Sequence, residues 1–324
     1  MDKLNNDNTT IITLTKGQRV IFNLFLSAMK KGESKVVLPT RINSNSIIYF
    51  IKLVIAEYPE LCQYDTCSCS YLYQGNSCIV KLNPAFGNRA MANELNAKAR
   101  RILDSIIVEK TSDIKKVLCI HDYLINNVTY RETELNSFNI SHTAYGAIVN
   151  NEAVCEGIAY GFSYLLKMSG VKATVVDGKA DDGAHAWNIV KIDSDCYHFD
   201  VTWDLIRKGD QNNMIYDYFC LCDSDLNERV WDRKIYPQCP SRKYNYFVLS
   251  NSFAHSENEL IRIMERQYPK YNAVYLKYDY FNYDRDKAMN YLWSLFLKTA
   301  QKQGWSVGSL HYAVNDDQSI FTIS

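Results

Sequence analysis

The stretch Asn151–Leu166, NEAVCEGIAYGFSYLL, places a cysteine between a polar turn and an apolar run. From Gly157 to Gly170, apolar residues recur every three or four positions, which predicts a helix that ends at Gly170. Cys155 then lies at the helix N-terminus, where free N–H groups and positive partial charge stabilise a thiolate. The alternative is a small apolar side chain that fills space where a helix begins.

Two strand-like runs after this helix carry a candidate base and a candidate acid that would orient it. His185 opens the run His185–Ile192, and Asp200 lies in the next run, Cys196–Trp203. A thiol nucleophile needs both kinds of partner. A lone histidine beside a strand is more often a structural residue, but the order Cys, His, Asp on neighbouring elements is less easily a coincidence.

The register of this hairpin decides whether the histidine and the aspartate can meet. If Asp193–Ser194 is a two-residue loop, Trp187 faces Asp200, and His185 shares the face of Trp187 because side chains alternate. Diagonal neighbours on one face lie about 7–8 Å apart, which is within reach of a His–Asp hydrogen bond. A loop one residue longer would put the two side chains on opposite faces.

The region resembles the transglutaminase-like superfamily in three blocks: AVCEGIAYGFSYLLKMSGV from Ala153, GAHAWNIVKI from Gly183 and HFDVTWD from His198. The resemblance covers about Thr111 to Asp204. It implies an α+β, papain-like core in which a cysteine-bearing helix packs on an antiparallel sheet. It also implies that Cys155 is the nucleophile, His185 the general base and Asp200 the orienting acid, which are the residues reached from spacing.

Several other side chains are candidates for the groove around this site. Tyr145 is a candidate second oxyanion donor beside the main-chain N–H of Cys155, although a core tyrosine is the commoner case. Trp187 either packs around the site or contacts substrate, and His142 is a candidate for lining the groove. His198, in the second strand run, is the rival candidate for the base.

The chain divides into three α+β regions by pattern. Residues 1–95 form an N-terminal accessory region, residues 96–245 the transglutaminase-like catalytic domain, and residues 246–324 a small C-terminal region. In the middle region, His121 and Asp122 form a second acid–base pair, but they lie within a predicted helix, where structural hydrogen bonding is favoured.

Composition limits the possible partners. The 324 residues carry no formal net charge, so binding to nucleic acid or to an anionic membrane is not expected. No apolar run approaches the ~20 residues of a membrane span, and no secretory leader is visible, which predicts a cytoplasmic protein. The ten cysteines follow no disulfide framework, so free thiols are expected.

A bound metal or cofactor is not expected either. The one cysteine group considered as a zinc site, Cys62, Cys67, Cys69 and Cys78, contains no CxxC pair. Peptide glycanases of the resembled superfamily carry such pairs, and its calcium-regulated cross-linking enzymes carry acidic loops and β-sandwich domains. Neither pattern occurs in this sequence.

The resemblance therefore favours a bacterial-type, metal-independent thiol hydrolase that cleaves peptide or amide bonds of a protein or peptide substrate through a thioester on Cys155. Transfer of the acyl group to an amine, as in protein cross-linking, is the first alternative. A non-catalytic binding module on the same fold is the second.

Overall fold

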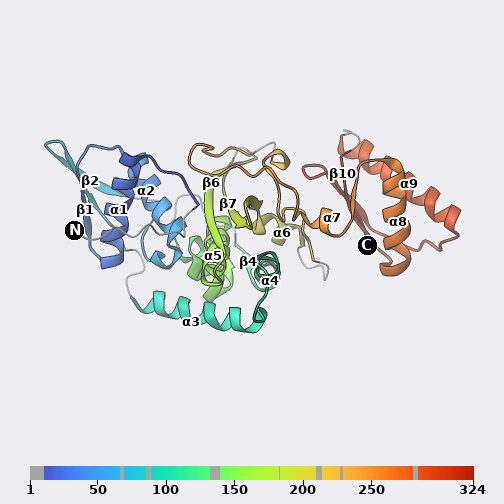
Figure 1. The fold of residues 1–324 in the computed structure, drawn as a ribbon, viewed down its shortest axis with the longest axis horizontal. Coiled ribbons are helices and arrows are strands. Elements are labelled where there is room, and N and C mark those ends of the chain that lie inside the picture. The colour runs from blue at the N-terminus through green and yellow to red at the C-terminus, as the bar shows by residue number, and fades with distance from the viewer. Residues whose placement is uncertain are drawn as a thin grey trace. The chain divides into compact units, whose positions relative to one another are not determined.

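The structure, a computed structural model, describes residues 11–65, 69–84, 89–131, 139–181, 183–208, 214–226, 229–279 and 284–324. The chain forms two units, Met1–Ile215 with Leu221–Ser241, and Tyr216–Cys220 with Arg242–Ser324. Both units combine helices with antiparallel strands (Figure 1), so the predicted α+β class is confirmed.

The centre of the first unit is a helix on a three-stranded antiparallel sheet. The sheet has the order β6-β7-β8 and the helix is α5, with the bounds Lys172–Ala180, Gly183–Ile192, Asp195–Phe199 and Cys155–Met168. The helix packs against β6 and β7 (Figure 1). Ten consecutive residues of α5, from Gly157 to Leu166, are buried, because the sheet covers one side of the helix and other helices cover the rest.

The hairpin between β7 and β8 has the short loop that the sequence predicts. Ile192 pairs with Asp195 across Asp193 and Ser194, so the two-residue loop is confirmed. Asp193 adopts a φ of 53°, a left-handed conformation that aspartate tolerates better than most residues. This register pairs Phe199, the last residue of β8, with Asn188 in the middle of β7.

The second strand of that hairpin is shorter than predicted. It ends at Phe199, and the helix α6 (Val201–Lys208) begins where the sequence pattern suggested strand as far as Trp203. The reason is a helix cap: Asp200 Oδ1 accepts a hydrogen bond from the Trp203 N–H at 3.1 Å, as an N-cap residue does. Asp200 therefore stands at the junction of a strand and a helix.

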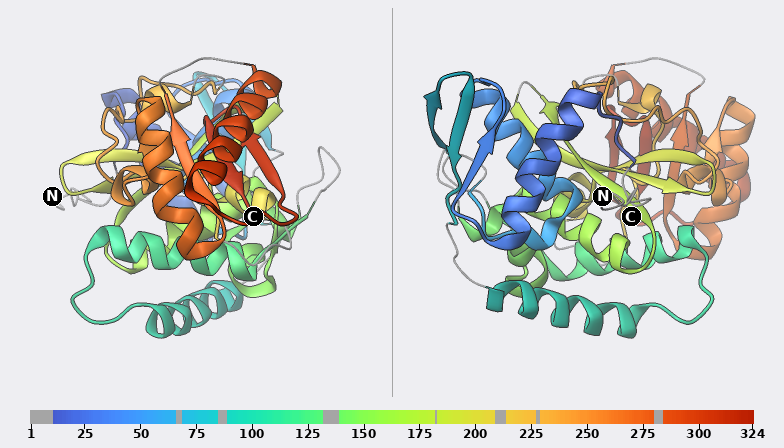
Figure 2. Two further views of the ribbon diagram at one scale, coloured as in Figure 1. Left: turned by 90° about the vertical axis from the view of Figure 1, so that its right-hand side faces the viewer. Right: turned by 60° about the vertical axis from the view of Figure 1, so that its left-hand side comes forward.

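Further helices surround this core. These are α3 (Arg89–Ile106), α4 (Asp113–Asn127), the 3₁₀-helices η2 (Ile140–His142) and η4 (Asp223–Asp225), and the π-helix η3 (Gly146–Asn150). The short strands β4 (Thr129–Tyr130) and β5 (Glu152–Ala153) pair in parallel just before α5. The long helix α3 lies along the outside, next to α4 and α5 (Figure 2).

The N-terminal part of the same unit has its own small sheet. Its elements are α1 (Lys16–Lys31), β1 (Lys35–Leu38), α2 (Ser44–Glu57), η1 (Pro59–Leu61), β2 (Ser70–Gln74) and β3 (Ser77–Lys81), with the strand order β1-β3-β2. Thr15 and Gln18 form a capping box at the start of α1, and Gly32 ends that helix with a φ of 71°. The helix α2 also contacts β6 and α5, so this part packs directly on the central core.

The second unit is a four-stranded sheet with helices against it. Its elements are α7 (Tyr246–Leu249), β9 (Phe253–Ala254), α8 (Glu257–Tyr271), β10 (Val274–Tyr278), α9 (Arg285–Gln303), β11 (Tyr312–Asn315) and β12 (Ile320–Ile323). The strand order is β11-β12-β10-β9. A separate core includes Met264, Leu276, Leu292, Phe296 and Phe321. Among the described residues, no helix has the length and apolar character needed to cross a bilayer.

Gly157 allows the chain before α5 to cross its first turn. A Cβ at this position would lie 2.1 Å from the Ser141 carbonyl oxygen and 3.0 Å from that of Thr143. Both atoms belong to the backbone, so a side-chain movement cannot relieve the contact. The glycine therefore brings the segment around His142 against the N-terminal end of α5.

We expect Gly157→Ala to destabilise the protein by about 1–3 kcal/mol, because the added methyl group overpacks a backbone contact. Gly17→Ala is the matched control, since Gly17 is also helical and no atom lies within 4 Å of the added Cβ. In α1 the exchange should instead stabilise the protein by up to about 1 kcal/mol. Chemical unfolding of both variants measures this; equal effects would contradict the packing argument.

Candidate active site

Cys155 is the first residue of α5, and its side chain is partly exposed. Val154 occupies the N-cap position and has no side-chain acceptor for the N–H groups of the first turn. The Cys155 thiol lies near enough to His185 of β7 to contribute to the raised pKa of that imidazole. The positive end of a helix and an imidazole therefore meet at one sulfur atom.

His185 is held from its other side by Asp200. Its Nε2 atom lies 2.7 Å from Asp200 Oδ2. Because Nε2 is engaged in this bond, Nδ1 is the nitrogen left to face the thiol. The carboxylate is 2% exposed and is also fixed through Oδ1 by the Trp203 N–H. The structure thus brings Cys155, His185 and Asp200 together in the order in which the sequence suggested them.

The charges of this pair reinforce each other. Burial disfavours the charged form of His185, but the Asp200 carboxylate and the hydrogen bonds to Asp200 and Cys155 outweigh it and raise the pKa of His185 to about 9. For Asp200, burial also disfavours the charge, yet His185 and Arg229 hold its pKa at about 2. The imidazolium–carboxylate form is therefore the stable one at neutral pH.

Arg229 is a fourth member of the site, which sequence reasoning missed. Its guanidinium donates a hydrogen bond to Asp200 Oδ2, the same oxygen that His185 contacts, and the residue is 8% exposed. The guanidinium also lies over the rings of Trp187 and Trp203, at 5.4 and 5.5 Å from their centroids. A buried arginine is rare unless it is paired. The sequence around Arg229 carries no motif that would have indicated Asp200 as its partner.

Glu156, the residue after the cysteine, anchors a second polar group. Its buried carboxylate contacts His142 Nδ1 at 3.0 Å, the Tyr160 hydroxyl at 3.2 Å and Lys52 at 3.6 Å. Burial alone would raise the pKa of Glu156, but His142 and Lys52 together lower it. Lys52 also pairs with Asp177 at 3.2 Å. His142 thus lies beside the helix terminus, with its ring nitrogen engaged by Glu156.

Two of the predicted groove residues have other partners. The Tyr145 hydroxyl donates to Glu94 of α3 at 2.6 Å, and this bond, together with burial, raises its pKa to about 12. Trp187 is 1% exposed and its indole N–H donates to His198. Both donors are thus engaged by acceptors within the protein. Trp187 instead packs against His185, with ring centroids 6.0 Å apart and an angle of 19° between planes.

The two remaining histidines of interest are both buried and doubly engaged. His198 contacts Trp187 through Nδ1 and Asp223 through Nε2, so neither nitrogen is free to act as the base that it was considered to be. His121 bridges Asp122 and Asp204, at 3.1 and 2.9 Å, and ties α4 to α6. This placement corresponds to a structural rather than a catalytic use.

The structure describes three of the four cysteines that were considered as a zinc group. Cys62 and Cys78 are buried, Cys69 is partly exposed, and Cys67 lies outside the described residues. The nine cysteines that the structure describes are free thiols. A group of possible metal ligands does occur elsewhere, formed by His198, Asp223 and Cys239.

A cleft of about 720 Å³ lies at the other end of α5. It is lined by residues of α2, α3 and α5, among them Glu57, Asn96, Tyr164 and Lys167. The helix has 14 residues, so its ends are about 20 Å apart. This cleft therefore does not contain the Cys155 sulfur, and we do not assign it to the reaction.

Titration of the histidine rings by NMR tests the charge state of the site. We expect His185 to titrate near pH 9 and, in Asp200→Asn, well below that value, because burial then dominates. Asparagine keeps the acceptor for the Trp203 N–H, so α6 retains its cap. In the same spectra His198 should titrate below its ordinary value, mainly because of burial. An unchanged His185 titration in the variant would contradict the assigned pairing.

The same pair predicts how stability depends on pH. The Asp200 contribution is complete above its ordinary pKa of 3.8 and is lost as the pH falls through about 2. The His185 contribution is complete below its ordinary pKa of 6.5 and is lost as the pH rises through about 9. The stability advantage of the wild type over Asp200→Asn should therefore be largest between pH 3.8 and pH 6.5.

We expect Arg229→Met to lower the free energy of unfolding by roughly 2–4 kcal/mol, because it breaks a buried ion pair. Arg233→Met is the control: the Arg233 side chain is 59% exposed and lies 3.8 Å from Asp223, so its loss should change stability by about 0.5 kcal/mol or less. Urea unfolding compares the two. Similar losses in both variants would show that the buried Arg229–Asp200 ion pair stabilises the protein no more than an exposed ion pair does.

Comparison with known proteins finds a family match for part of the chain. The family model of the transglutaminase-like superfamily matches residues 100–201, which include Cys155, His185 and Asp200. No curated protein matches the chain.

Two solved structures are similar to parts of the chain. One is the crystal structure of a TGase, with 16% identity, a TM-score of 0.33 and coverage of 52% of this chain and 50% of that one. Another, from Cytophaga hutchinsonii and provisionally described as a cysteine protease, has 15% identity, a TM-score of 0.30 and coverage of 51% and 65%. The matched part thus spans about half to two-thirds of these structures. The part of the chain that carries the site, residues 100–201, is thus similar to the transglutaminase-like superfamily.

Proposed function

We propose that this protein is a thiol-dependent acyl-transfer enzyme that cleaves peptide or amide bonds through a thioester on Cys155. The observation that carries the proposal is the placement of the Cys155 thiol near His185, together with the contact between His185 and Asp200. A partly exposed sulfur, a base near it and a buried carboxylate behind the base are the parts that nucleophilic catalysis requires.

The geometry supports the following sequence of steps. His185, as the imidazolium, pairs with the Cys155 thiolate, and the thiolate sulfur attacks the carbonyl carbon of the substrate. The main-chain N–H of Cys155, in the unpaired first turn of α5, is placed to stabilise the resulting oxyanion. The His185 imidazolium then gives its proton to the leaving amine, and a thioester remains on Cys155. Water, deprotonated by His185, attacks the thioester and releases the acid and the free thiol.

Asp200 has a defined part in these steps. Its carboxylate accepts from Nε2 of His185 and so keeps Nδ1 directed at the sulfur. It also stabilises the imidazolium that forms each time the ring takes a proton. Arg229 prevents the carboxylate from taking that proton itself, because a guanidinium on the same oxygen favours the ionised form.

Hydrolysis is the first choice, and transfer to an amine is the second candidate. The two reactions share the thioester and differ only in whether water or an amine resolves it. The superfamily contains both kinds of enzyme. Incubation with a glutamine-containing peptide and a labelled primary amine separates them: release of ammonia with no label favours hydrolysis, and covalent labelling favours transfer.

Alkylation by iodoacetamide near neutral pH tests the nucleophile without knowledge of the substrate. We expect Cys155 to react at least about tenfold faster than Cys69 and Cys119, which are also partly exposed but whose pKa values burial raises. His185→Ala should remove most of this preference, because the thiol loses its proton acceptor. Peptide mapping by mass spectrometry measures each site.

Peptide cleavage then tests the reaction. New N-termini produced from a peptide library should disappear in Cys155→Ala and persist in Cys119→Ser, a matched loss of a partly exposed thiol. If all three partly exposed thiols react alike and no cleavage or transfer occurs, the site is a non-catalytic binding module and the proposal is wrong.

A further inference from the structure

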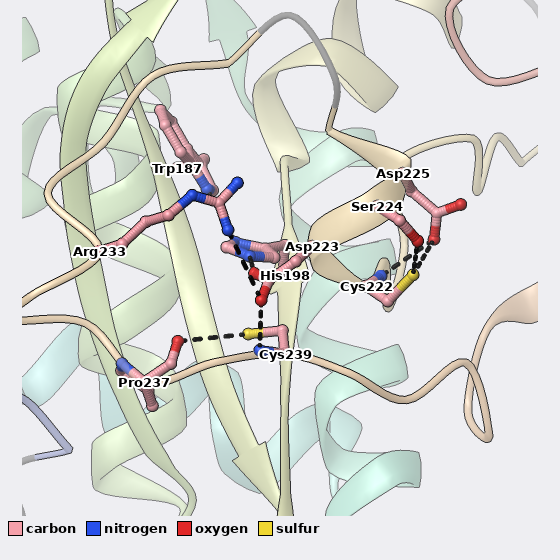
Figure 3. A network of polar contacts seen from close by, with 9 residues as sticks. All are labelled: Trp187, His198, Cys222, Asp223, Ser224, Asp225, Arg233, Pro237 and Cys239. Atoms are coloured by element: carbon pink, nitrogen blue, oxygen red, sulfur yellow. Dashed lines mark hydrogen bonds and ion pairs between the residues drawn. The ribbon is translucent and has the colours of Figure 1, made fainter.

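A second cluster of polar side chains lies in the same unit as His185, with His198 and Cys239 buried and Asp223 partly exposed. His198, Asp223 and Cys239 each offer one possible ligand atom, and these atoms lie within 4.8 Å of one another (Figure 3). A histidine, a carboxylate and a cysteine at this spacing are the donor types of a zinc site. The hydrogen bonds of the cluster decide whether these side chains have lone pairs available to bind a metal ion.

The proton positions on His198 follow from its neighbours. The Trp187 indole N–H can only donate, and it lies 3.1 Å from His198 Nδ1, so Nδ1 must be the acceptor. The neutral ring then carries its proton on Nε2, which donates to Asp223 Oδ1 at 2.9 Å. A metal at Nε2 would need the lone pair that this proton occupies. Burial further raises the pKa of the Cys239 thiol, which keeps it neutral. The hydrogen bonds therefore form a continuous chain from Trp187 through His198 to Asp223, called the relay below. This chain occupies both ring nitrogens of His198.

Asp223 is the fixed end of this relay. Its main-chain N–H donates to the Cys239 carbonyl at 2.8 Å, and its Oδ2 accepts from the Cys239 N–H at 3.1 Å. His198 is fixed as well, because its main chain exchanges two hydrogen bonds of 2.9 Å with Leu221. Cys222, Ser224 and Asp225 form a separate group to one side (Figure 3).

Trp187 is the end of the relay that contacts the active site. Its ring packs against His185, and its edge is held by the bond to His198. The ring has little room to turn: a Cβ added at Gly178 would lie 2.6 Å from it, and Trp231 meets it edge-on at 5.8 Å between centroids. The orientation of the indole therefore sets the surface on which the His185 ring rests.

We propose that His198 and Asp223 are positioning residues for His185, and that they act by holding the Trp187 ring through its N–H. This rests on the proposed function of Cys155 and His185. By accepting a hydrogen bond from Nε2, the Asp223 carboxylate selects the tautomer of His198 that accepts from Trp187, and the ordered indole then limits the rotation of His185. His185 consequently keeps Nδ1 toward the sulfur and Nε2 toward Asp200.

A double-mutant cycle tests the route. His198→Phe removes the acceptor for the indole N–H, and Trp187→Phe removes the N–H but keeps an aromatic ring beside His185. Each single variant should slow Cys155 alkylation by roughly 5–50-fold and shift its pH profile upward, because a misplaced imidazole takes the thiol proton less readily. The double variant should be no slower than the slower single variant, since both changes break one bond. His198→Gln, which restores an acceptor, should recover most of the rate.

Cys222→Ser is the control, because Cys222 lies beside the cluster but outside the relay. Circular dichroism and thermal unfolding establish that each variant is folded. The His185 titration by NMR provides a second readout that does not depend on alkylation. It should move in His198→Phe and stay unchanged in Cys222→Ser.

Three results would overturn the inference: folded His198 and Trp187 variants with wild-type alkylation and wild-type His185 titration, full additivity in the cycle, or stoichiometric zinc in the protein that is lost in Cys239→Ser. Failure of the proposed function has a different signature. In that case wild-type Cys155 shows no preferential alkylation, and the His185 titration alone decides whether His198 positions the ring.

Discussion

The carboxylate of Asp200 is the interaction on which the rest of the site depends. One oxygen caps α6 through the Trp203 N–H, and the other receives both His185 and Arg229. Because it is buried, its charge is tolerated only with these partners in place. The same group therefore ends a strand, begins a helix and orients the imidazole that faces Cys155. The negative charge of Asp200 thus contributes both to the fold and to the proposed chemistry.

Much of this could be predicted from local sequence. The position of Cys155 at a helix start followed from apolar periodicity, and the hairpin register followed from a two-residue loop between alternating strands. Both are short-range features, which sequence patterns describe well. The error at the end of β8 has a local cause too: Asp200, three residues before Trp203, is an N-cap signal that was taken for part of a strand.

The unpredicted parts come from contacts between distant segments. Arg229 contacts Asp200 from a later segment of the chain, which bridges to Lys179 of β6 through Val230. Sequence periodicity does not indicate such contacts between distant segments. The hydroxyl of Tyr145, a candidate oxyanion donor, donates a hydrogen bond to Glu94, 51 residues earlier in the chain. Trp187 carries the indole that a groove would use, yet its N–H faces inward to His198. The direction of a side chain depends on partners that spacing alone does not identify.

Lys52 has a consequence for the limits of the domain. The family match begins at residue 100, but this lysine of α2 reaches the carboxylate of Glu156, next to the nucleophile. Lys167 of α5 likewise binds the end of α2 at the Glu57 carbonyl, at 2.7 Å. A fragment cut at the edge of the family match would keep the cysteine but lose a counter-ion of its neighbour. The contacts that support α5 therefore extend beyond the segment that the family match covers.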